Sequence, residues 1–217
     1  MLPLLFSCNI YSPLQGEGSA EDLIEEGMKC LHKRDYDCAI EKYNKLPDGE
    51  EKNKLLCLTN VTKAGASIST LATVAKNKNQ AATPQRMLGE YAKSLLPWSE
   101  ARQAGADGAK TGCLNAASGD FGILLKTLAY ITHCATLMAK TDAVGGNNNG
   151  RLTKSDIDTM GDEDVRTCGG DIASVSSSEV SSAGMTDISA AISGIPAEIL
   201  SEATAQIKSG LKDTLLE

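Results

Sequence analysis

Aromatic side chains are scarce in this sequence: Phe, Trp and Tyr together make up 4% of its 217 residues. A β-sandwich or barrel would draw heavily on Val, Thr and aromatic residues. The core must instead be built from Leu, Ile, Val, Met and Ala, a composition that suits packing between helices. The sequence therefore predicts an all-α fold.

The sequence also lacks a cluster of basic residues. It has no uncharged apolar run of about 18 residues, the minimum for a helix that spans a bilayer. A nucleic-acid-binding surface needs clustered Lys and Arg, so we expect no nucleic-acid partner and no transmembrane helix. The net charge is −7, and the whole excess falls in residues 111–217.

Motifs of the common enzyme classes are absent as well. We find no nucleophile elbow, P-loop, dinucleotide-binding glycine pattern, HExxH motif or spaced pair of carboxylates. The chain has only two histidines, His32 and His133, and no CxxC, which disfavours a zinc site. His133, beside Cys134 in an apolar run, is better explained as a core residue than as half of a catalytic dyad. We expect a protein that is not an enzyme and requires no cofactor.

Cysteine, in contrast, is abundant, with seven residues, which is many for a reducing cytosol. The chain begins MLPLLFSC, with a leucine three positions before Cys8 and a small residue directly before it. This segment resembles the lipobox of bacterial lipoproteins. The resemblance implies cleavage before Cys8, acylation of its thiol, and anchoring to a membrane of the cell envelope on the periplasmic side. An unmodified, buried start of the chain is the alternative.

Six further thiols could form three disulfides: Cys30, Cys38, Cys57, Cys113, Cys134 and Cys168. The sequence does not choose among the many possible connectivities. Cys30 and Cys38 are the nearest pair and would face each other across a helical hairpin. A bridge between them is our first expectation, and two packed free thiols are the alternative.

Composition divides the chain into three parts. Residues 1–18 combine the lipobox-like start with a tether rich in Ser, Gly and Pro. Residues 19–168 hold most of the amphipathic segments and predict one helical domain. Residues 169–217 predict a Gly/Ser-rich linker and a C-terminal helix, Pro196–Leu216. That helix either packs back on the same domain, the commoner outcome, or presents an apolar stripe to a partner helix.

Within the domain, the segment Ser19–Pro47 predicts two helices joined by a tight turn. Small and large residues alternate along it at the positions Leu23, Gly27, Tyr36, Ala39 and Tyr43. This pattern resembles a tetratricopeptide repeat (TPR), in which small residues such as Gly27 and Ala39 allow two helices to cross closely. No second copy is visible, so the rest should be an irregular helical bundle. Glu50–Lys76 predicts one long helix, and the apolar segment Asp120–Lys140 predicts the central one.

One loop has the composition of a metal site. Asp142–Ile157 reads DAVGGNNNGRLTKSDI and resembles part of an EF-hand or dockerin-type calcium loop. The resemblance assigns the ligands to Asn147, Asn149, the carbonyl of Arg151, and Asp156, and Asp142 would join them only through a non-standard loop. Gly145 stands where the first aspartate is expected, so any calcium site would be weak. The alternative is a plain turn in which Asn and Gly supply left-handed backbone conformations.

Together these features predict a lipid-anchored, periplasm-facing helical adaptor. In the TPR-containing lipoproteins that the chain resembles, a groove binds segments of other envelope proteins, which implies protein partners of that kind here. The alternative function is a helical carrier of a small apolar ligand that works with a membrane transporter. It predicts an enclosed cavity lined by the segments Glu50–Lys76 and Asp120–Lys140.

Overall fold

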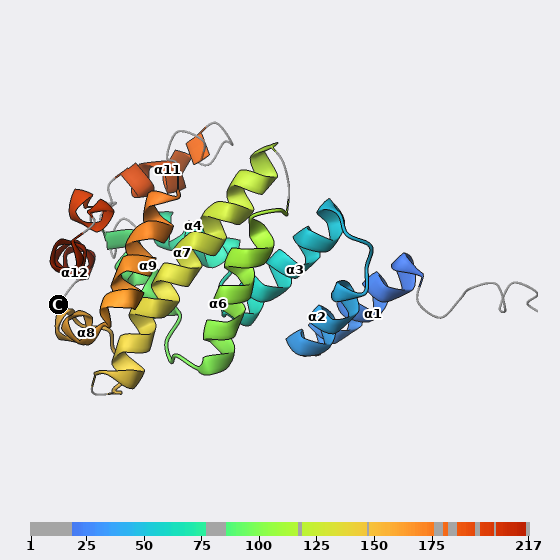
Figure 1. Ribbon diagram of the computed structural model, residues 1–217, viewed down its shortest axis with the longest axis horizontal. Coiled ribbons are helices and arrows are strands. Elements are labelled where there is room, and N and C mark those ends of the chain that lie inside the picture. The colour runs from blue at the N-terminus through green and yellow to red at the C-terminus, as the bar shows by residue number, and fades with distance from the viewer. Residues whose placement is uncertain are drawn as a thin grey trace, which may run out of the picture. The chain divides into compact units, whose positions relative to one another are not determined.

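The computed structural model describes residues 19–76, 86–116, 119–146, 148–175, 180–181, 186–193, 196–201 and 203–215. This part of the chain consists of helices and connecting turns and contains no β-strand (Figure 1), so the predicted all-α class is confirmed. The helices are α1 (Ala20–His32), α2 (Tyr36–Asn44), α3 (Glu50–Lys63), α4 (Ile68–Lys76), α5 (Met87–Ser94), α6 (Glu100–Cys113), α7 (Gly119–Val144), α8 (Lys154–Thr159), α9 (Asp162–Ala173), α11 (Thr186–Ser193), the 3-10 helix η2 (Ala197–Leu200) and α12 (Thr204–Asp213).

The chain divides after Asp48 into two compact units. The first, Met1–Asp48, contains α1 and α2, and the second, Gly49–Glu217, contains all the other helices named above. The sequence instead predicted one domain over residues 19–168. The difference arises because α1 and α2 contact each other and enclose a small core of their own.

The predicted start of a linker at residue 169 lies inside α9, which continues to Ala173. Val165, Cys168 and Ile172 share the buried face of this helix and hold it against the core. Gly169 is not a linker residue, because a Cβ atom at this position would come within 2.9 Å of the Ile199 carbonyl oxygen. The glycine thus permits a close helix contact.

Helix α7 forms the centre of the second unit. It lies between α6 and α9 (Figure 1) and also contacts α3, α5 and α8. By length and composition α7 is the one described helix that could cross a membrane. However, 72% of its most apolar 18-residue segment is buried inside the protein. A helix that is apolar on all sides needs such cover. We therefore interpret α7 as a core helix.

The predicted single helix over Glu50–Lys76 is wrong, because the chain breaks between α3 and α4. Gly65 adopts a φ of 85°, a left-handed conformation that ends a helix at low cost for glycine. The Ser67 hydroxyl then accepts a hydrogen bond from the Thr70 N–H (3.0 Å) and caps the start of α4.

Helices α3 and α6 pack closely because α6 presents glycines to α3. A Cβ atom on Gly105 would lie 2.6 Å from the Ala64 nitrogen and 2.9 Å from the Asn60 carbonyl oxygen. One on Gly108 would lie 2.6 Å from the Asn60 side chain. At the other end of this contact a disulfide joins Cys57 of α3 to Cys113 of α6. The glycines of α6 therefore allow its backbone to lie close to that of α3, although glycine lowers the intrinsic helix propensity of the segment.

The C-terminal segment is also divided where the sequence predicted one helix, Pro196–Leu216. The 3-10 helix η2 and α12 are separate and pack on each other, since a Cβ atom on Gly210 would lie 2.7 Å from Ile199 Cγ1. The Ser201 hydroxyl accepts a hydrogen bond from the Ala203 N–H (3.2 Å) in the turn between them. Ile207 and Leu211 are buried and join the core of the second unit.

The α3–α6 contact can be tested with a pair of alanine substitutions. We expect Gly105→Ala to lower the free energy of unfolding by about 1–3 kcal/mol, because the methyl group has no room against α3. Gly170→Ala is the matched control, because no atom lies within 4 Å of its added Cβ. It should stabilise α9 by up to about 1 kcal/mol through helix propensity. Urea unfolding followed by circular dichroism measures both, and equal midpoints for the two variants would contradict the packing argument.

Candidate functional site

The first unit is a helical hairpin with a cap at the start of each helix. The Asp22 N–H donates to the Ser19 hydroxyl (3.2 Å) at the start of α1, and the Cys38 N–H donates to the Asp35 carboxylate (3.1 Å) at the start of α2. Arg34 has a φ of 59° and makes the sharp turn between the helices. The sequence thus fixes both helix starts locally.

The predicted helix-crossing residues lie in the core of this hairpin. Gly27, Ala39 and Tyr43 are buried, and Tyr36 is half-buried at the start of α2. The Tyr43 ring lies directly against Gly27, in the space that a Cβ atom would need. Burial raises the pKa of the Tyr43 phenol above its usual value. Glycine in α1 therefore makes room for an aromatic ring from α2.

Three disulfides pair all six candidate cysteines. Cys30 bonds to Cys38 within the hairpin, with their Cα atoms 5.8 Å apart. Cys57 bonds to Cys113, and Cys134 of α7 bonds to Cys168 of α9, with Cα separations of 4.7 and 4.3 Å. The expected Cys30–Cys38 bridge is therefore present, and the structure supplies the other two pairings, which the sequence left open. Cys8, the predicted lipidation site, lies outside the described residues.

One face of α1 carries apolar side chains that the hairpin does not enclose. Leu23, Gly27 and Cys30 form the buried face. Each next residue along the chain is rotated by about 100° around the helix axis. This rotation places a second apolar row on an adjacent face, composed of Ile24, Met28 and Leu31. We call these three residues the α1 stripe.

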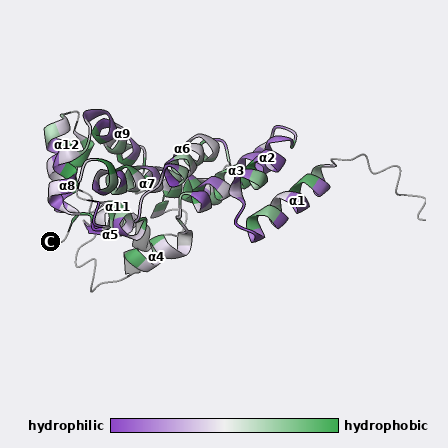
Figure 2. Ribbon diagram, turned by 90° about the horizontal axis from the view of Figure 1, so that it is seen from below, coloured by the Kyte–Doolittle hydropathy of each residue, from purple (hydrophilic) through white to green (hydrophobic). Residues whose placement is uncertain are grey.

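The α1 stripe is open to solvent. Met28, at its centre, is 48% exposed, and Ile24 and Leu31 are half-buried. Hydrophobic residues alternate with hydrophilic ones along α1 (Figure 2). The stripe runs from an acidic first turn, with Glu21 and Asp22, to a last turn that contains Lys29 and His32.

The predicted calcium loop is organised by hydrogen bonds to its side chains. The buried Asp142 carboxylate accepts from the backbone N–H groups of Asn149 (3.2 Å) and Gly150 (3.0 Å). The Asn149 side-chain oxygen accepts from the Arg151 N–H (2.8 Å). Asp156 forms a capping box with Thr153 at the start of α8. Asn147 lies outside the described residues.

These contacts account for the aspartates without a cation. No group of three or more His, Cys, Asp or Glu side chains is placed to hold a metal ion in the described part of the chain. Asp142 and Asp156 bind the backbone of the turn and of the start of α8, respectively, and Asn148 and Gly150 adopt the left-handed conformations of the plain-turn alternative. Calcium binding at this loop stays a prediction.

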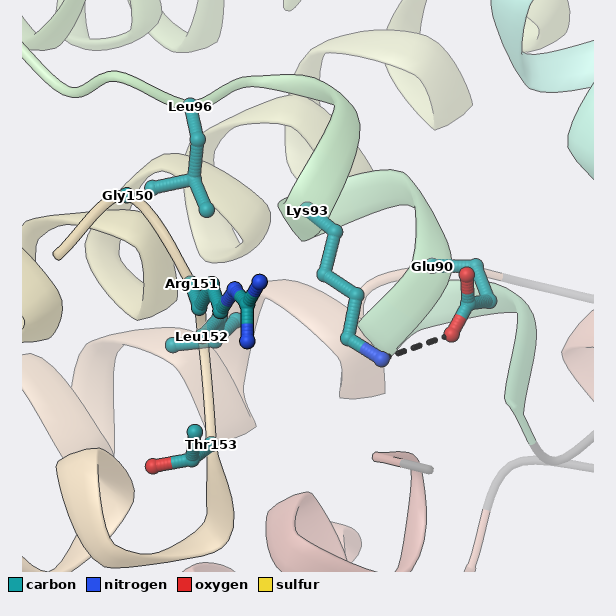
Figure 3. Close-up of a pocket in the computed structure, with 7 residues that line it drawn as sticks. All are labelled: Glu90, Lys93, Leu96, Gly150, Arg151, Leu152 and Thr153. Carbon is teal, nitrogen blue, oxygen red and sulfur yellow. Dashed lines mark hydrogen bonds and ion pairs between the residues drawn. The ribbon is translucent and has the colours of Figure 1, made fainter. Parts of the chain in front are cut away.

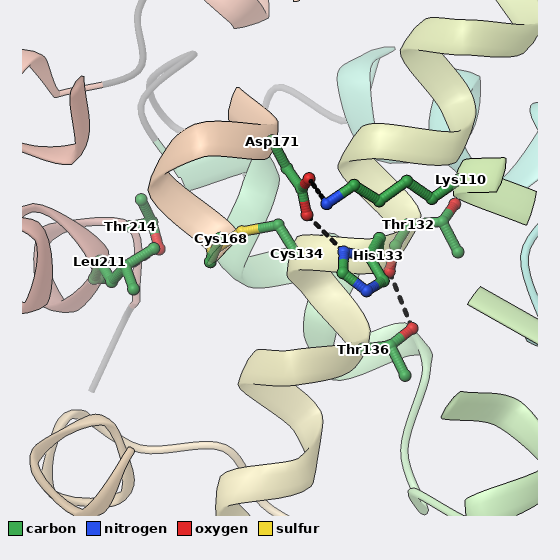
Figure 4. The surroundings of a disulfide bond; sticks show 9 residues. All are labelled: Lys110, Thr132, His133, Cys134, Thr136, Cys168, Asp171, Leu211 and Thr214. Atoms are coloured by element: carbon green, nitrogen blue, oxygen red, sulfur yellow. Dashed lines mark hydrogen bonds and ion pairs between the residues drawn. A yellow bond between two sulfur atoms is a disulfide. The ribbon is translucent and has the colours of Figure 1, made fainter. Parts of the chain in front are cut away.

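A charged cluster around His133 was not predicted from the sequence. His133 Nδ1 contacts the Asp171 carboxylate of α9, and Nε2 lies 3.0 Å from Asp107 Oδ1 of α6. The Lys110 ammonium, also on α6, forms an ion pair with Asp171 at 2.7 Å. Figure 4 shows Lys110 and His133 converging on Asp171, beside the Cys134–Cys168 disulfide.

The cluster is suited to joining helices. Asp171 is 1% exposed, so its charge needs partners, and it receives them from α6 and α7. The described side-chain contacts of the His133 ring are both with carboxylates, one from α9 and one from α6.

A signal for this cluster does exist in the sequence. Asp171 follows Cys168 by three positions and therefore shares its helix face, while His133 directly precedes Cys134. Once Cys134 is known to pair with Cys168, His133 and Asp171 must lie near each other. The disulfide connectivity was the missing piece of information.

The role of Asp171 can be tested by neutralising either aspartate of the cluster. Asp171→Asn should lower the free energy of unfolding by about 3 kcal/mol, because it removes the buried carboxylate that pairs with Lys110 and contacts His133. Asp107→Asn should cost less than about 1 kcal/mol, since the Asp107 side chain is 57% exposed. Thermal melting of both variants measures the difference. A loss as large for Asp107 as for Asp171 would show that burial does not set the importance of these contacts.

Comparison with protein-family models, with curated proteins and with solved structures finds no match to this chain. The interpretation of the hairpin, the α1 stripe and the charged cluster therefore depends on their geometry alone. Of these, the α1 stripe is the feature that offers a surface to another molecule.

Proposed function

We propose that the protein is an exported helical adaptor of the bacterial cell envelope, lipid-anchored through Cys8, that binds other envelope proteins with its α1 stripe. The observation that carries this proposal is the disulfide-bonded hairpin with an apolar row left open on α1. Its compartment and its mode of binding have separate support.

Export is supported by the pairing of the cysteines. Disulfides persist in oxidising compartments such as the periplasm and are rare in a reducing cytosol. All six cysteines of the described residues are paired, in each case between two helices. The Cys57–Cys113 and Cys134–Cys168 bridges join residues 56 and 34 positions apart. In the chain-entropy account, a disulfide that closes a longer loop stabilises the fold more than one that closes a short loop. The lipobox-like start agrees with the same compartment.

Binding is supported by the construction of the first unit. A lone hairpin cannot bury both faces of its helices, so it keeps an apolar surface. The Cys30–Cys38 bridge holds α1 against α2, which reduces the ordering that binding would otherwise require. The spacing of Ile24, Met28 and Leu31 fits an amphipathic helix or extended apolar segment laid along α1. The occupant we propose is such a segment of another exported protein.

Site-specific photocrosslinking tests the surface. A photoreactive phenylalanine analogue in place of Met28 should crosslink to one envelope protein in the native cells. The same analogue at Asn44, an exposed polar position on α2, is the matched control and should not. Adding Ile24→Glu should remove the Met28 crosslink, because a carboxylate interrupts the apolar row. Crosslinks of equal yield from both positions, or none from position 28, would contradict the proposal.

The compartment is tested by intact mass. Protein purified from the native membrane fraction should have the mass of a chain that starts at Cys8 and carries acyl groups. The six cysteines of the disulfides should resist alkylation until a reductant is added, and all six should react afterwards. Alkylation before reduction would place the protein in a reducing compartment. A mass without acyl groups would remove the lipid anchor and leave the binding surface to be judged by crosslinking.

A further inference from the structure

The second unit contains an open cavity of about 500 Å³ between the end of α5 and the loop that precedes α8. Figure 3 shows its lining, which consists of Glu90, Lys93, Leu96, Gly150, Arg151, Leu152 and Thr153. This volume is within the range of small-molecule sites. The cavity is not lined by α3 or α7, where the sequence predicted a pocket for an apolar ligand.

Two cationic side chains enter this cavity from different elements. Lys93 extends from α5 and forms an ion pair with Glu90 at 2.9 Å. Arg151 extends from the loop on the other side, and Figure 3 shows the two side chains pointing into the same space. The lining thus contains two cations and one carboxylate, in a chain whose net charge is −7.

The loop that presents Arg151 is held in place by its own hydrogen bonds. Asp142, at the end of α7, binds the N–H groups of Asn149 and Gly150, and the Asn149 side chain binds the Arg151 N–H at 2.8 Å. The Arg151 guanidinium has no hydrogen-bond or ion-pair partner among the residues that the structure describes. Its backbone is thus fixed, while its five N–H donors are available.

Two leucines supply the apolar part of the wall. Leu152 is 2% exposed and belongs to the core, and Leu96, which follows α5, packs against that core. Apolar walls with a few polar groups are the usual composition of a site that binds and orients a small ligand. The cations define one end of such a ligand and the leucines define the other.

We propose that this cavity binds a small carboxylate with a short branched or linear apolar tail. The carboxylate would form a two-pronged contact with the Arg151 guanidinium, which matches its geometry, and lie near the Lys93 ammonium. The tail would lie against Leu96 and Leu152. This binding is independent of the α1 stripe, because its residues all belong to the second unit.

Calorimetry on the full chain with isovalerate as the probe tests this proposal. Isovalerate should bind at millimolar concentrations, whereas its neutral amide, isovaleramide, should bind at least tenfold more weakly. Inorganic phosphate is an anion without an apolar tail, so it tests whether charge alone is sufficient for binding. It should also bind at least tenfold more weakly than isovalerate. No binding of isovalerate, or equal binding of the amide or of phosphate, would overturn the proposal.

Substitutions locate the binding. Arg151→Gln should weaken isovalerate binding at least tenfold, and Lys93→Gln should weaken it several-fold. Arg166→Gln is the matched control, because Arg166 is an exposed arginine of α9 that lines a separate cavity, and it should leave binding unchanged. Unchanged melting temperatures would show that the variants fold. Equal losses for Arg151→Gln and Arg166→Gln would mean that the interaction follows total charge, which would overturn the site.

Discussion

The second unit depends on the need to cover α7 on all sides. This helix is 26 residues long, and 16 of them are buried. Because its apolar residues do not form a single stripe, no single neighbour can shield it, and α3, α5, α6, α8 and α9 all contact it. The glycines Gly105 and Gly169 allow close contacts among the covering helices themselves, α6 with α3 and α9 with η2 and α12.

Burial of α7 also decides how its polar residues are used. Thr132 hydrogen-bonds to the Tyr91 hydroxyl at 3.0 Å, and burial raises the pKa of Tyr91 to about 12, so the phenol stays neutral at ordinary pH. His133 meets carboxylates on both ring nitrogens. A buried polar group without a partner would destabilise the fold, so each of these contacts ties α7 to a neighbour and sets the register between helices.

The two units offer surfaces of different chemistry. The hairpin exposes an apolar row on a short, disulfide-bonded module, which suits a protein segment. The cavity in the second unit combines two cations with two leucines, which suits a small anion with an apolar tail. A protein with both surfaces would bind a protein segment and a small molecule at separate places. The cavity is connected to the core through Asp142 in the last turn of α7. Its carboxylate accepts hydrogen bonds from the loop that carries Arg151.

The sequence by itself determined the helical class and the helical hairpin of Ser19–Pro47, and it favoured the Cys30–Cys38 bridge, because these depend on composition and on neighbours within one or two turns. It did not determine the break at Gly65, the uninterrupted course of α9 through Gly169, or the His133–Asp171 contact. A glycine can end a helix or allow another helix to approach, and only the surrounding atoms decide between these roles. The cavity of Lys93 and Arg151 likewise joins residues far apart in the chain, which only tertiary packing around α7 brings together.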